Sequence, residues 1–334
     1  MKIHEKYIKR CIEIGKNGLG NTAPNPMVGC VLVVNNQIIS EGFTSPFGGS
    51  HAEVNAINNV KDKSLLKKAT LYVTLEPCSH HGKTPPCADL IVAHNIPEVV
   101  IGCIDSNPKV GGKGIQKLRG HGINVVVGVM EKECRHHHRR FFTYHEKKRP
   151  YIILKWAQSE DGFIAPITRV EREPVWITNR YSRQLVHKWR AEEQAILVGA
   201  NTVLQDNPSL TTREVGGKNP IRVVIDIRGN LSKDSNVFDD SSKTVILDHI
   251  SLDKNQPLAT QICARLHEQS INSVIVEGGT KTLQLFIDEG LWDESRVFTG
   301  PITLHKGVAC PTFEGKLYDE RKINSDILRT YIND

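Results

Sequence analysis

Apolar residues follow two alternating patterns along the 334-residue chain. Short apolar runs, such as residues 28–34, 70–75 and 99–104, have the length of buried β-strands. Other segments, such as residues 4–18, place apolar residues three or four positions apart, which is the spacing of a helix that packs on one face. We therefore expect an α/β fold, with helices on the faces of a mixed or parallel sheet.

The same alternation starts again after Arg149-Pro150. A chain of this length can bury two separate cores. We expect one domain over residues 1–147 and a second α/β domain over residues 148–334. The apolar runs of the second half predict strands at 151–156, 195–198, 221–225, 244–247 and 273–276, with helices that end near Arg190 and that cover 258–269 and 281–289.

The composition is that of a globular protein, with 39% apolar and 24% charged residues. No apolar run approaches the roughly 20 residues that a membrane-spanning helix needs. The first ten residues, MKIHEKYIKR, carry charges where a signal peptide has an apolar segment. We expect a cytoplasmic protein without a membrane partner. In such a protein the eight cysteines are expected to be free thiols rather than a disulfide framework.

The net charge of +6 is concentrated in one segment, residues 135–149. This segment holds six Lys and Arg residues against the single acid Glu146, a net charge of +5. A basic stretch at a domain junction is weak evidence for nucleic-acid binding. We interpret it as a solvated helix end and linker, and expect no nucleic-acid partner.

One cluster of residue types in the first half predicts metal chemistry. His51, Cys78 and Cys87 supply an imidazole and two thiolates, a three-ligand set for Zn²⁺ that leaves one coordination position open. Glu53, two residues after the histidine, can serve as the proton shuttle for a water at the open position. The pattern matches the zinc-deaminase signature, except that eight residues separate the two cysteines.

The predicted elements place these ligands at the starts of helices. His51 lies where a helical pattern begins, and Cys87 follows Pro85-Pro86, which is typical of the first turn of a helix. The positive end of a helix favours a thiolate over a thiol. The spacing alone leaves a structural zinc site open as an alternative, in which His80 or His81 would be the fourth ligand.

The triplet His136-His137-His138 is a second candidate for metal binding. Consecutive residues on a helix point in different directions, so the three rings cannot face one metal ion together. We interpret the triplet as an exposed helix face.

The segment between the cysteines carries a family resemblance. Residues 77–87, PCSHHGKTPPC, together with the loop PNPMVG at residues 24–29 and DSNP at residues 105–108, resemble the deaminase half of the bifunctional deaminase/reductases of riboflavin biosynthesis. The resemblance implies a cytidine-deaminase-like α/β/α domain with one Zn²⁺ per chain. It implies substrate contacts at Asn25, His80, Lys83, Asp105 and Asn107.

The second half resembles the reductase half of the same family, which has a dihydrofolate-reductase-like α/β fold. The resemblance lies in LKWAQSEDGFIA, WIT, HKWRAEEQAILVGANTVLQDNPSLTTR and VEGGTKTL, from residue 154 to residue 283. It implies NADPH contacts at Ala157, Trp176, Thr202, Asp206, Gly279, Thr280, Lys281, Thr282, Leu283, Gln284 and Leu285. It implies substrate contacts at Arg190, Leu210, Arg213 and Glu277, where the two arginines suit a phosphate.

The turn at residues 277–280 agrees with a diphosphate site on physical grounds. Gly278 and Gly279 let backbone N–H groups approach an anion, and the next helix begins there. A plain tight turn between a strand and a helix is the alternative, since the chain has no GxGxxG fingerprint.

The expected function is zinc-dependent deamination of a phosphorylated diaminopyrimidine, followed by NADPH-dependent reduction of its ribosyl group. The resemblance also leads us to expect a homo-oligomer, a dimer or larger. Two alternatives remain open: a deaminase of nucleosides or RNA bases whose second domain only binds, and a structural zinc site joined to a nucleotide sensor. The first requires a basic, aromatic-rich surface, whereas only 6% of the residues are aromatic.

Overall fold

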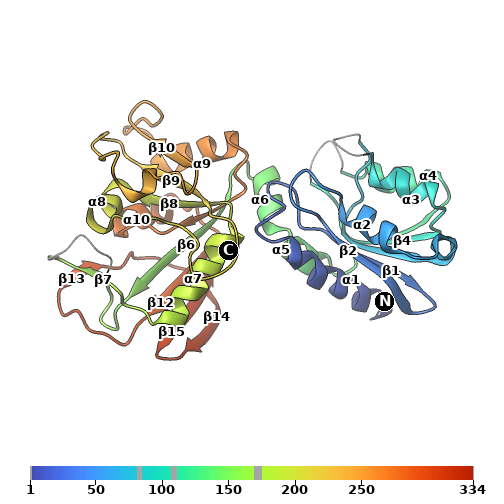
Figure 1. The fold of residues 1–334 in the computed structure, drawn as a ribbon, viewed down its shortest axis with the longest axis horizontal. Coiled ribbons are helices and arrows are strands. Elements are labelled where there is room, and N and C mark those ends of the chain that lie inside the picture. Colours follow the sequence, from blue (N-terminus) through green and yellow to red (C-terminus); the bar gives the residue numbers. More distant parts are fainter. Residues whose placement is uncertain (1, 81–84, 107–110, 169–174, 334) are drawn as a thin grey trace. The chain divides into compact units, whose positions relative to one another are not determined.

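The computed structural model describes residues 2–80, 85–106, 111–168 and 175–333. They form two compact units, Met1–Lys148 and Arg149–Asp334, each with its own sheet and core (Figure 1). This division lies one residue after the boundary expected from the sequence. Each unit is described separately below.

The first unit is built on a five-stranded sheet in the order β2-β1-β3-β4-β5. The antiparallel hairpin β1–β2 turns through Asn35-Asn36, and both residues have positive φ angles, of 49° and 61°. Such angles are what a two-residue hairpin turn requires. The strands β3, β4 and β5 are parallel to one another, so the expected mixed sheet is confirmed. The strands are β1 (Gly29–Val34), β2 (Gln37–Phe43), β3 (Thr70–Leu75), β4 (Glu98–Cys103) and β5 (Asn124–Val127).

Helices cover both faces of this sheet (Figure 1). Three glycines in the strands show which helix packs on which face, because a side chain added at each would overlap a helix. Gly29 lies against α1, Gly42 against α2 and Gly102 against Cys134 of α5. Thus α1 and α5 cover one face, while α2, α3 and α4 cover the other. The helices are α1 (Lys2–Gly15), α2 (Ala52–Asn59), α3 (Cys87–Ala93), α4 (Lys113–Gly120), α5 (Glu131–His137) and α6 (Arg139–Glu146), with short 3₁₀ helices at Lys16–Gly18 and Lys63–Lys68.

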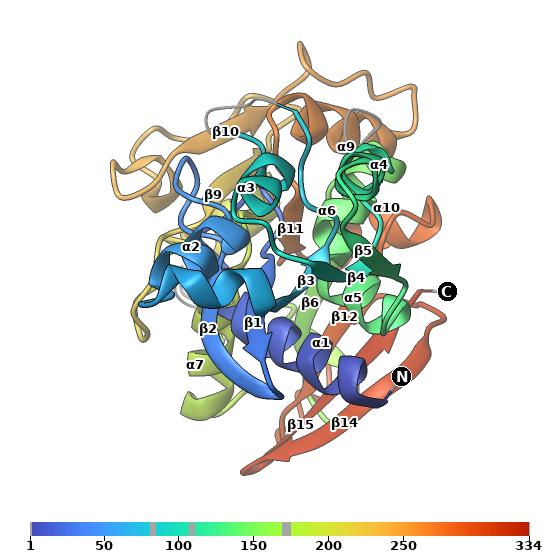
Figure 2. The ribbon, with the colours of Figure 1, turned by 90° about the vertical axis from the view of Figure 1, so that its right-hand side faces the viewer.

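The second unit contains an eight-stranded sheet in the order β10-β9-β8-β11-β6-β12-β15-β14. The first six strands in this order are parallel, whereas β15 and β14 form an antiparallel hairpin at the edge beside β12 (Figure 2). The strands are β6 (Tyr151–Gln158), β8 (Ala195–Gly199), β9 (Ile221–Ile225), β10 (Thr244–Leu247), β11 (Ser273–Val276), β12 (Glu294–Thr299), β14 (Lys316–Ile323) and β15 (Asp326–Ile332), with β7 (Phe163–Pro166) and β13 (Gly307–Ala309) paired apart from the sheet.

The two faces of this sheet bury separate apolar clusters. On β6, Ile152 and Leu154 face the cluster that holds α9 and α10, whereas Tyr151 and Ile153 face the cluster that holds α7. This alternation follows from the two-residue repeat of a strand. The helices are α7 (Arg180–Glu192), α8 (Ala200–Asp206), α9 (Leu258–Glu268) and α10 (Thr280–Asp288), with a 3₁₀ helix at Asn236–Phe238. The α/β fold expected for both halves is confirmed.

The interpretation of residues 135–149 as a solvated helix end and linker holds for residues 146–148, which are exposed, but is wrong for His137, His138 and Arg149. His137 and His138 are buried, with exposed fractions of 4% and 2%, and only His136 of the triplet is exposed. Arg149 is buried as well, because its guanidinium donates two hydrogen bonds to the carboxylate of Asp293, at 2.6 and 2.8 Å. The segment therefore belongs to the packed structure of both units.

No helix among the described residues is long and apolar enough to span a membrane. The cysteines are free, and Cys30 and Cys103 are buried in the core of the first unit.

Gly29→Ala is expected to destabilise the first unit. A methyl group at this position would overlap the carbonyl oxygen of Cys11 in α1, and main-chain atoms cannot move aside as a flexible side chain can. We expect a loss of at least the roughly 1–3 kcal/mol that is typical of overpacking. Urea unfolding measures it. Gly120→Ala is the matched control, because nothing lies within 4 Å of its added methyl group; equal stability of the two variants would contradict this account of the packing.

Candidate functional sites

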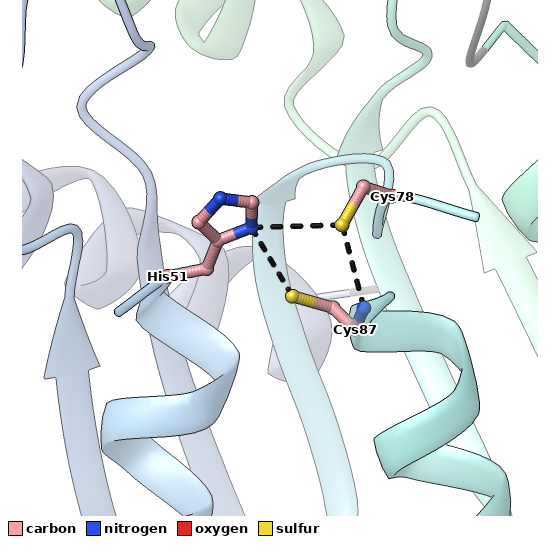
Figure 3. A group of neighbouring side chains, drawn as sticks. All are labelled: His51, Cys78 and Cys87. Carbon is pink, nitrogen blue, oxygen red and sulfur yellow. Dashed lines mark hydrogen bonds between the residues drawn. The ribbon is translucent and has the colours of Figure 1, made fainter. Parts of the chain in front are cut away.

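His51, Cys78 and Cys87 come together at one end of the first sheet (Figure 3). The Nδ1 atom of His51 lies 3.5 Å from the Sγ of Cys78 and 3.3 Å from the Sγ of Cys87. His51 is the N-cap of α2, Cys87 is the first residue of α3, and Cys78 follows the end of β3. Within the described part of the chain, this is the one group of three or more potential metal ligands whose donor atoms lie close together.

The donor set fits a zinc ion. In a tetrahedral site with Zn–N and Zn–S bonds of about 2.1 and 2.3 Å, the donor atoms are roughly 3.6 Å apart. The observed separations of 3.3 and 3.5 Å are close to this value. No fourth Cys, His, Asp or Glu of the described residues joins the group. The described residues thus supply three ligands, one fewer than the closed shell of a structural site, and His81, an expected alternative fourth ligand, lies outside them.

The two thiols are electrostatically unequal. Hydrogen bonds from Cys87 and then from His51 lower the pKa of Cys78 to about 4, and the backbone N–H of Cys87 also donates to its sulfur at 3.3 Å. The same pairing with Cys78, together with burial, raises the pKa of the Cys87 thiol. Cys78 is thus the thiolate of the pair, and Cys87 is the thiol that keeps its proton. A zinc ion would replace that proton, and its binding would release it.

Glu53 lies in the first turn of α2, two residues from His51, and is only 3% exposed. Burial, and then the charge of the Cys78 thiolate, raise the pKa of Glu53 to about 7. A carboxyl group with a pKa near neutrality can accept a proton and return it. A nearby dication would lower this pKa and favour the carboxylate at the start of a reaction.

His51, Cys78 and Glu53 line a cavity of about 390 Å³ in the first unit. Asn25, His80 and Asp105 line the same cavity, so the structure brings these three expected substrate residues together with the metal ligands. Lys83 and Asn107 lie outside the described residues. The sequence did not identify several further lining residues, namely Thr44, Phe47, Glu76, Phe141, Tyr144 and His145.

Glu76, which lines the cavity, fixes the backbone of the segments beside it. It is buried directly after β3, and its carboxylate accepts hydrogen bonds from the backbone N–H groups of Asp105 (3.3 Å), Gly112 (2.9 Å), Gly114 (2.9 Å) and Ile115 (3.2 Å). These bonds fix the start of α4 and the segment that follows β4 beside Pro77. An acid at the carboxyl end of a buried strand is the sequence signal that could have indicated this role.

A hydrogen bond from α5 fixes the loop that carries Asn25. The Nε2–H of His137 donates to the carbonyl oxygen of Met27 at 2.7 Å, two residues after Asn25. Burial lowers the pKa of His137 to about 4, so the ring is neutral at physiological pH. The hydroxyl of Thr74 accepts from the N–H of Gly29 at 3.2 Å and lies 3.0 Å from the Nε2 of His138.

The second unit has its own cavity, of about 690 Å³, at the carboxyl ends of its parallel strands. Most of the residues expected to bind substrate and cofactor line it: Ala157, Trp176, Arg190, Thr202, Asp206, Leu210, Arg213, Glu277 and Gly279. The other expected cofactor residues, Thr280 to Leu285, belong to α10 and do not line the cavity. Among them Leu283 is fully buried in the core, so the structure does not bring this side chain to the cavity.

Oppositely charged side chains pair with one another among the residues that line this cavity. The guanidinium of Arg190 donates two hydrogen bonds to the carboxylate of Glu277, at 3.1 and 2.7 Å, and a third to the carbonyl of Thr211 at 3.3 Å. The ammonium of Lys155 lies 3.8 Å from the same carboxylate. Burial would raise the pKa of Glu277, but Arg190 and Lys155 outweigh it and lower the pKa to about 2. Glu277 is therefore a fixed anion.

Arg213 is fixed on the opposite side of Thr211. Its backbone N–H donates to the Nδ1 of His187 at 3.2 Å, and its Nη1 donates to the Thr211 hydroxyl at 3.2 Å. Leu210, just before this point, has a positive φ of 54° although it is buried and is not glycine. This strained conformation turns the segment so that Leu210 and Arg213 both line the cavity.

Comparison with known proteins assigns the family. The model of the cytidine and deoxycytidylate deaminase zinc-binding region matches residues 1–103, and the model of the RibD C-terminal domain matches residues 150–332. The chain is 39% identical over 324 residues to the riboflavin biosynthesis protein RibD of Aquifex aeolicus, covering 92% of this chain and 90% of that one. This chain belongs to the RibD family.

Other members of the RibD family agree with this assignment. RibD of Escherichia coli is 34% identical over 332 residues, covering 89% of this chain and 87% of its own. The crystal structure of a Thermotoga maritima diaminohydroxyphosphoribosylaminopyrimidine deaminase/5-amino-6-(5-phosphoribosylamino)uracil reductase superposes with a TM-score of 0.90 at 39% identity over 99% of both chains. RibD of Acinetobacter baumannii gives 0.89 at 33% identity, again over 99% of both chains.

Glu76→Gln is expected to loosen the first cavity. The amide keeps one acceptor oxygen but presents an NH₂ group to backbone donors, and leaving such buried donors unpaired costs about 1–3 kcal/mol. We expect lower stability in urea unfolding and weaker retention of zinc against a chelator. Glu98→Gln, at the opposite end of β4, is the matched control, since Glu98 bonds only side chains there. Equal zinc retention in both variants would argue against a supporting role for Glu76.

Proposed function

We propose that the chain is a two-step enzyme of riboflavin biosynthesis. The first unit deaminates 2,5-diamino-6-ribosylamino-4(3H)-pyrimidinone 5′-phosphate by hydrolysis. The second unit reduces the ribosyl group with NADPH, giving 5-amino-6-ribitylaminouracil 5′-phosphate. The observation that carries the proposal is the cavity that Glu53 shares with His51 and Cys78, two members of a three-residue set of zinc ligands.

In the deamination, a zinc ion held by His51, Cys78 and Cys87 supplies the Lewis acidity that makes water a nucleophile near neutral pH. Glu53 accepts a proton as water adds to the amine-bearing ring carbon. The same carboxyl group passes this proton to the ring nitrogen, then takes the second proton of the added water and passes it to the amine. The carbon–nitrogen bond breaks, ammonia leaves, and the ring keeps the oxygen of water. Asn25, held through Met27 by His137, orients the ring.

In the reduction, NADPH supplies a hydride for C1′ of the ribosyl group, the C1′–O4′ bond opens, and the freed oxygen takes a proton from water. The chain binds and orients the two reactants. Gly279 is the N-cap of α10, where helix geometry favours the diphosphate of the cofactor, and its N–H already donates to the Thr202 hydroxyl at 3.2 Å. We assign the substrate phosphate to Arg213, because the guanidinium of Arg190 is engaged with Glu277 and Thr211.

The match of residues 150–332 to the RibD C-terminal domain favours this proposal over a nucleoside or RNA deaminase with a binding module. The proposed partners are small molecules, a phosphorylated pyrimidine and NADPH. Assembly into a homo-oligomer and a cytoplasmic location stay predictions.

Glu53→Gln is expected to abolish ammonia release while zinc stays bound. The amide cannot accept the proton of water, and Glu53 is not among the metal-ligating group. We expect a loss of at least the ~10²–10⁴-fold that general acid–base groups contribute. Ammonia release and metal content are measured on the same preparation, with NADPH oxidation on the deaminated substrate as the control. Loss of zinc would make Glu53 a ligand, and unchanged ammonia release would refute the proton role.

Arg213→Ala is expected to raise the KM of the reductase for the deaminated pyrimidine at least tenfold, since a charge-assisted hydrogen bond contributes about 1.5–3 kcal/mol. The KM for NADPH and the rate of ammonia release should not change. Arg265→Ala is the matched control, because Arg265 lies on the exposed side of α9 and pairs with Glu268. A raised KM for NADPH would instead place Arg213 at the cofactor.

A further inference from the structure

One face of α7 lines the second cavity. The residues on this face are spaced three or four positions apart, which places them along one side of the helix: Arg183, Val186, His187 and Arg190. The sequence indicated a role for Arg190 only. His187 lies one turn before Arg190 and is 5% exposed, so its ring is enclosed by the protein although it borders the cavity.

An irregular segment, residues 209–213, is bound to this face of the helix. It contains no helix or strand, so its position depends on individual hydrogen bonds. The carbonyl of Thr211 accepts a hydrogen bond from Arg190 at 3.3 Å. The backbone N–H of Arg213 donates to the Nδ1 of His187 at 3.2 Å. Two residues of α7, one turn apart, therefore hold two points of the segment.

Arg213 depends on such support because it is exposed. Packing does not fix an exposed arginine, whose long side chain loses rotamer freedom when it is held in one geometry. Its guanidinium donates a hydrogen bond to the hydroxyl of Thr211 at 3.2 Å, which lies within the same segment. The bond to His187 joins the main chain of Arg213 to α7, so the helix sets where the guanidinium starts from.

The direction of this bond defines the state of the imidazole. A backbone N–H can only donate, so the Nδ1 of His187 accepts, and the proton of the neutral ring is on Nε2. Burial, and then the charges of Arg190 and Arg213, lower the pKa of His187. The ring therefore stays neutral at neutral pH and keeps its acceptor. An asparagine has an oxygen at the place of Nδ1, whereas a leucine of similar size has none.

We propose that His187 is a positioning residue of the reductase, which fixes the backbone of Arg213 and so the place where its guanidinium meets the substrate phosphate. The inference rests on the proposed function, which assigns that phosphate to Arg213. The phosphate does not react in the hydride transfer, so contacts to it bind ground state and transition state alike. A loss of positioning therefore raises KM and leaves kcat unchanged.

The first test compares two substitutions of His187 by NADPH oxidation. His187→Leu removes the acceptor and should raise the KM for the deaminated, phosphorylated pyrimidine about threefold or more, with kcat within about twofold. A factor of three corresponds to roughly 0.6 kcal/mol, the lower part of the range for one hydrogen bond. His187→Asn restores an acceptor at the same place and should keep this KM within about 1.5-fold of that of the unmodified chain.

A double-mutant cycle shows whether His187 acts through Arg213. In the Arg213→Ala background the guanidinium is absent, so His187→Leu should change the KM by less than about 1.5-fold. A side chain that contacts the substrate itself, or that only supports the fold, would raise the KM by the same factor in both backgrounds. The KM for NADPH and the rate of ammonia release report whether each variant is intact.

Lys188→Leu is the matched control on the same helix, because Lys188 is exposed and pairs with Glu192 at 3.7 Å. His187→Ala, which also lacks an acceptor, takes the place of His187→Leu if the leucine variant does not fold.

Four results would each overturn the inference: an unchanged KM in the variant that lacks an acceptor, an equal rise in KM for His187→Asn, a lower kcat with unchanged KM, or equal factors in both backgrounds of the cycle. If the unmodified chain does not oxidise NADPH with the deaminated pyrimidine at all, the proposed function itself fails.

Discussion

The first unit depends on the meeting of one strand end with two helix starts. At the end of β3, the N-termini of α2 and α3 place His51 and Cys87 next to Cys78. Helix N-termini carry partial positive charge and unpaired N–H groups, and the N–H of Cys87 donates to the sulfur of Cys78. The Cys78 thiolate is stable there before a metal binds. Glu76 secures the same point, because its carboxylate ties the strand end to α4.

The two cavities use charge in different ways. The first cavity brings together acidic groups and thiolates, so a divalent cation would compensate their negative charge. A Lys or Arg side chain beside Glu53 would lower the pKa of this carboxyl group further and weaken its ability to return a proton. The second cavity is balanced within the protein, because Arg190 and Lys155 surround Glu277. This pairing keeps Glu277 ionised, and it needs no metal.

The sequence was sufficient for features that depend on local pattern. The buried strands and the helix starts at His51 and Cys87 follow from residue spacing and backbone preference, and the structure has them. The metal ligands were found because their chemistry is unusual. The hairpin of β14 and β15 was not foreseen, since β14 is largely exposed and lacks a buried apolar run.

What the sequence did not show depends on contacts between distant residues. His137 bonds Met27 across 110 positions, and a His-Arg-rich helix looks solvated when its partner is unknown. The buried face of α6 carries Phe141 and Phe142 beside exposed charges, so its composition favours solvent while its packing requires a core. Such a segment can be assigned only when the fold shows what it covers. In this chain α5 packs against β4 and α6 lines the metal cavity, so a mixed basic and aromatic composition reflects two environments, with rings toward the core and cavity and charges toward water.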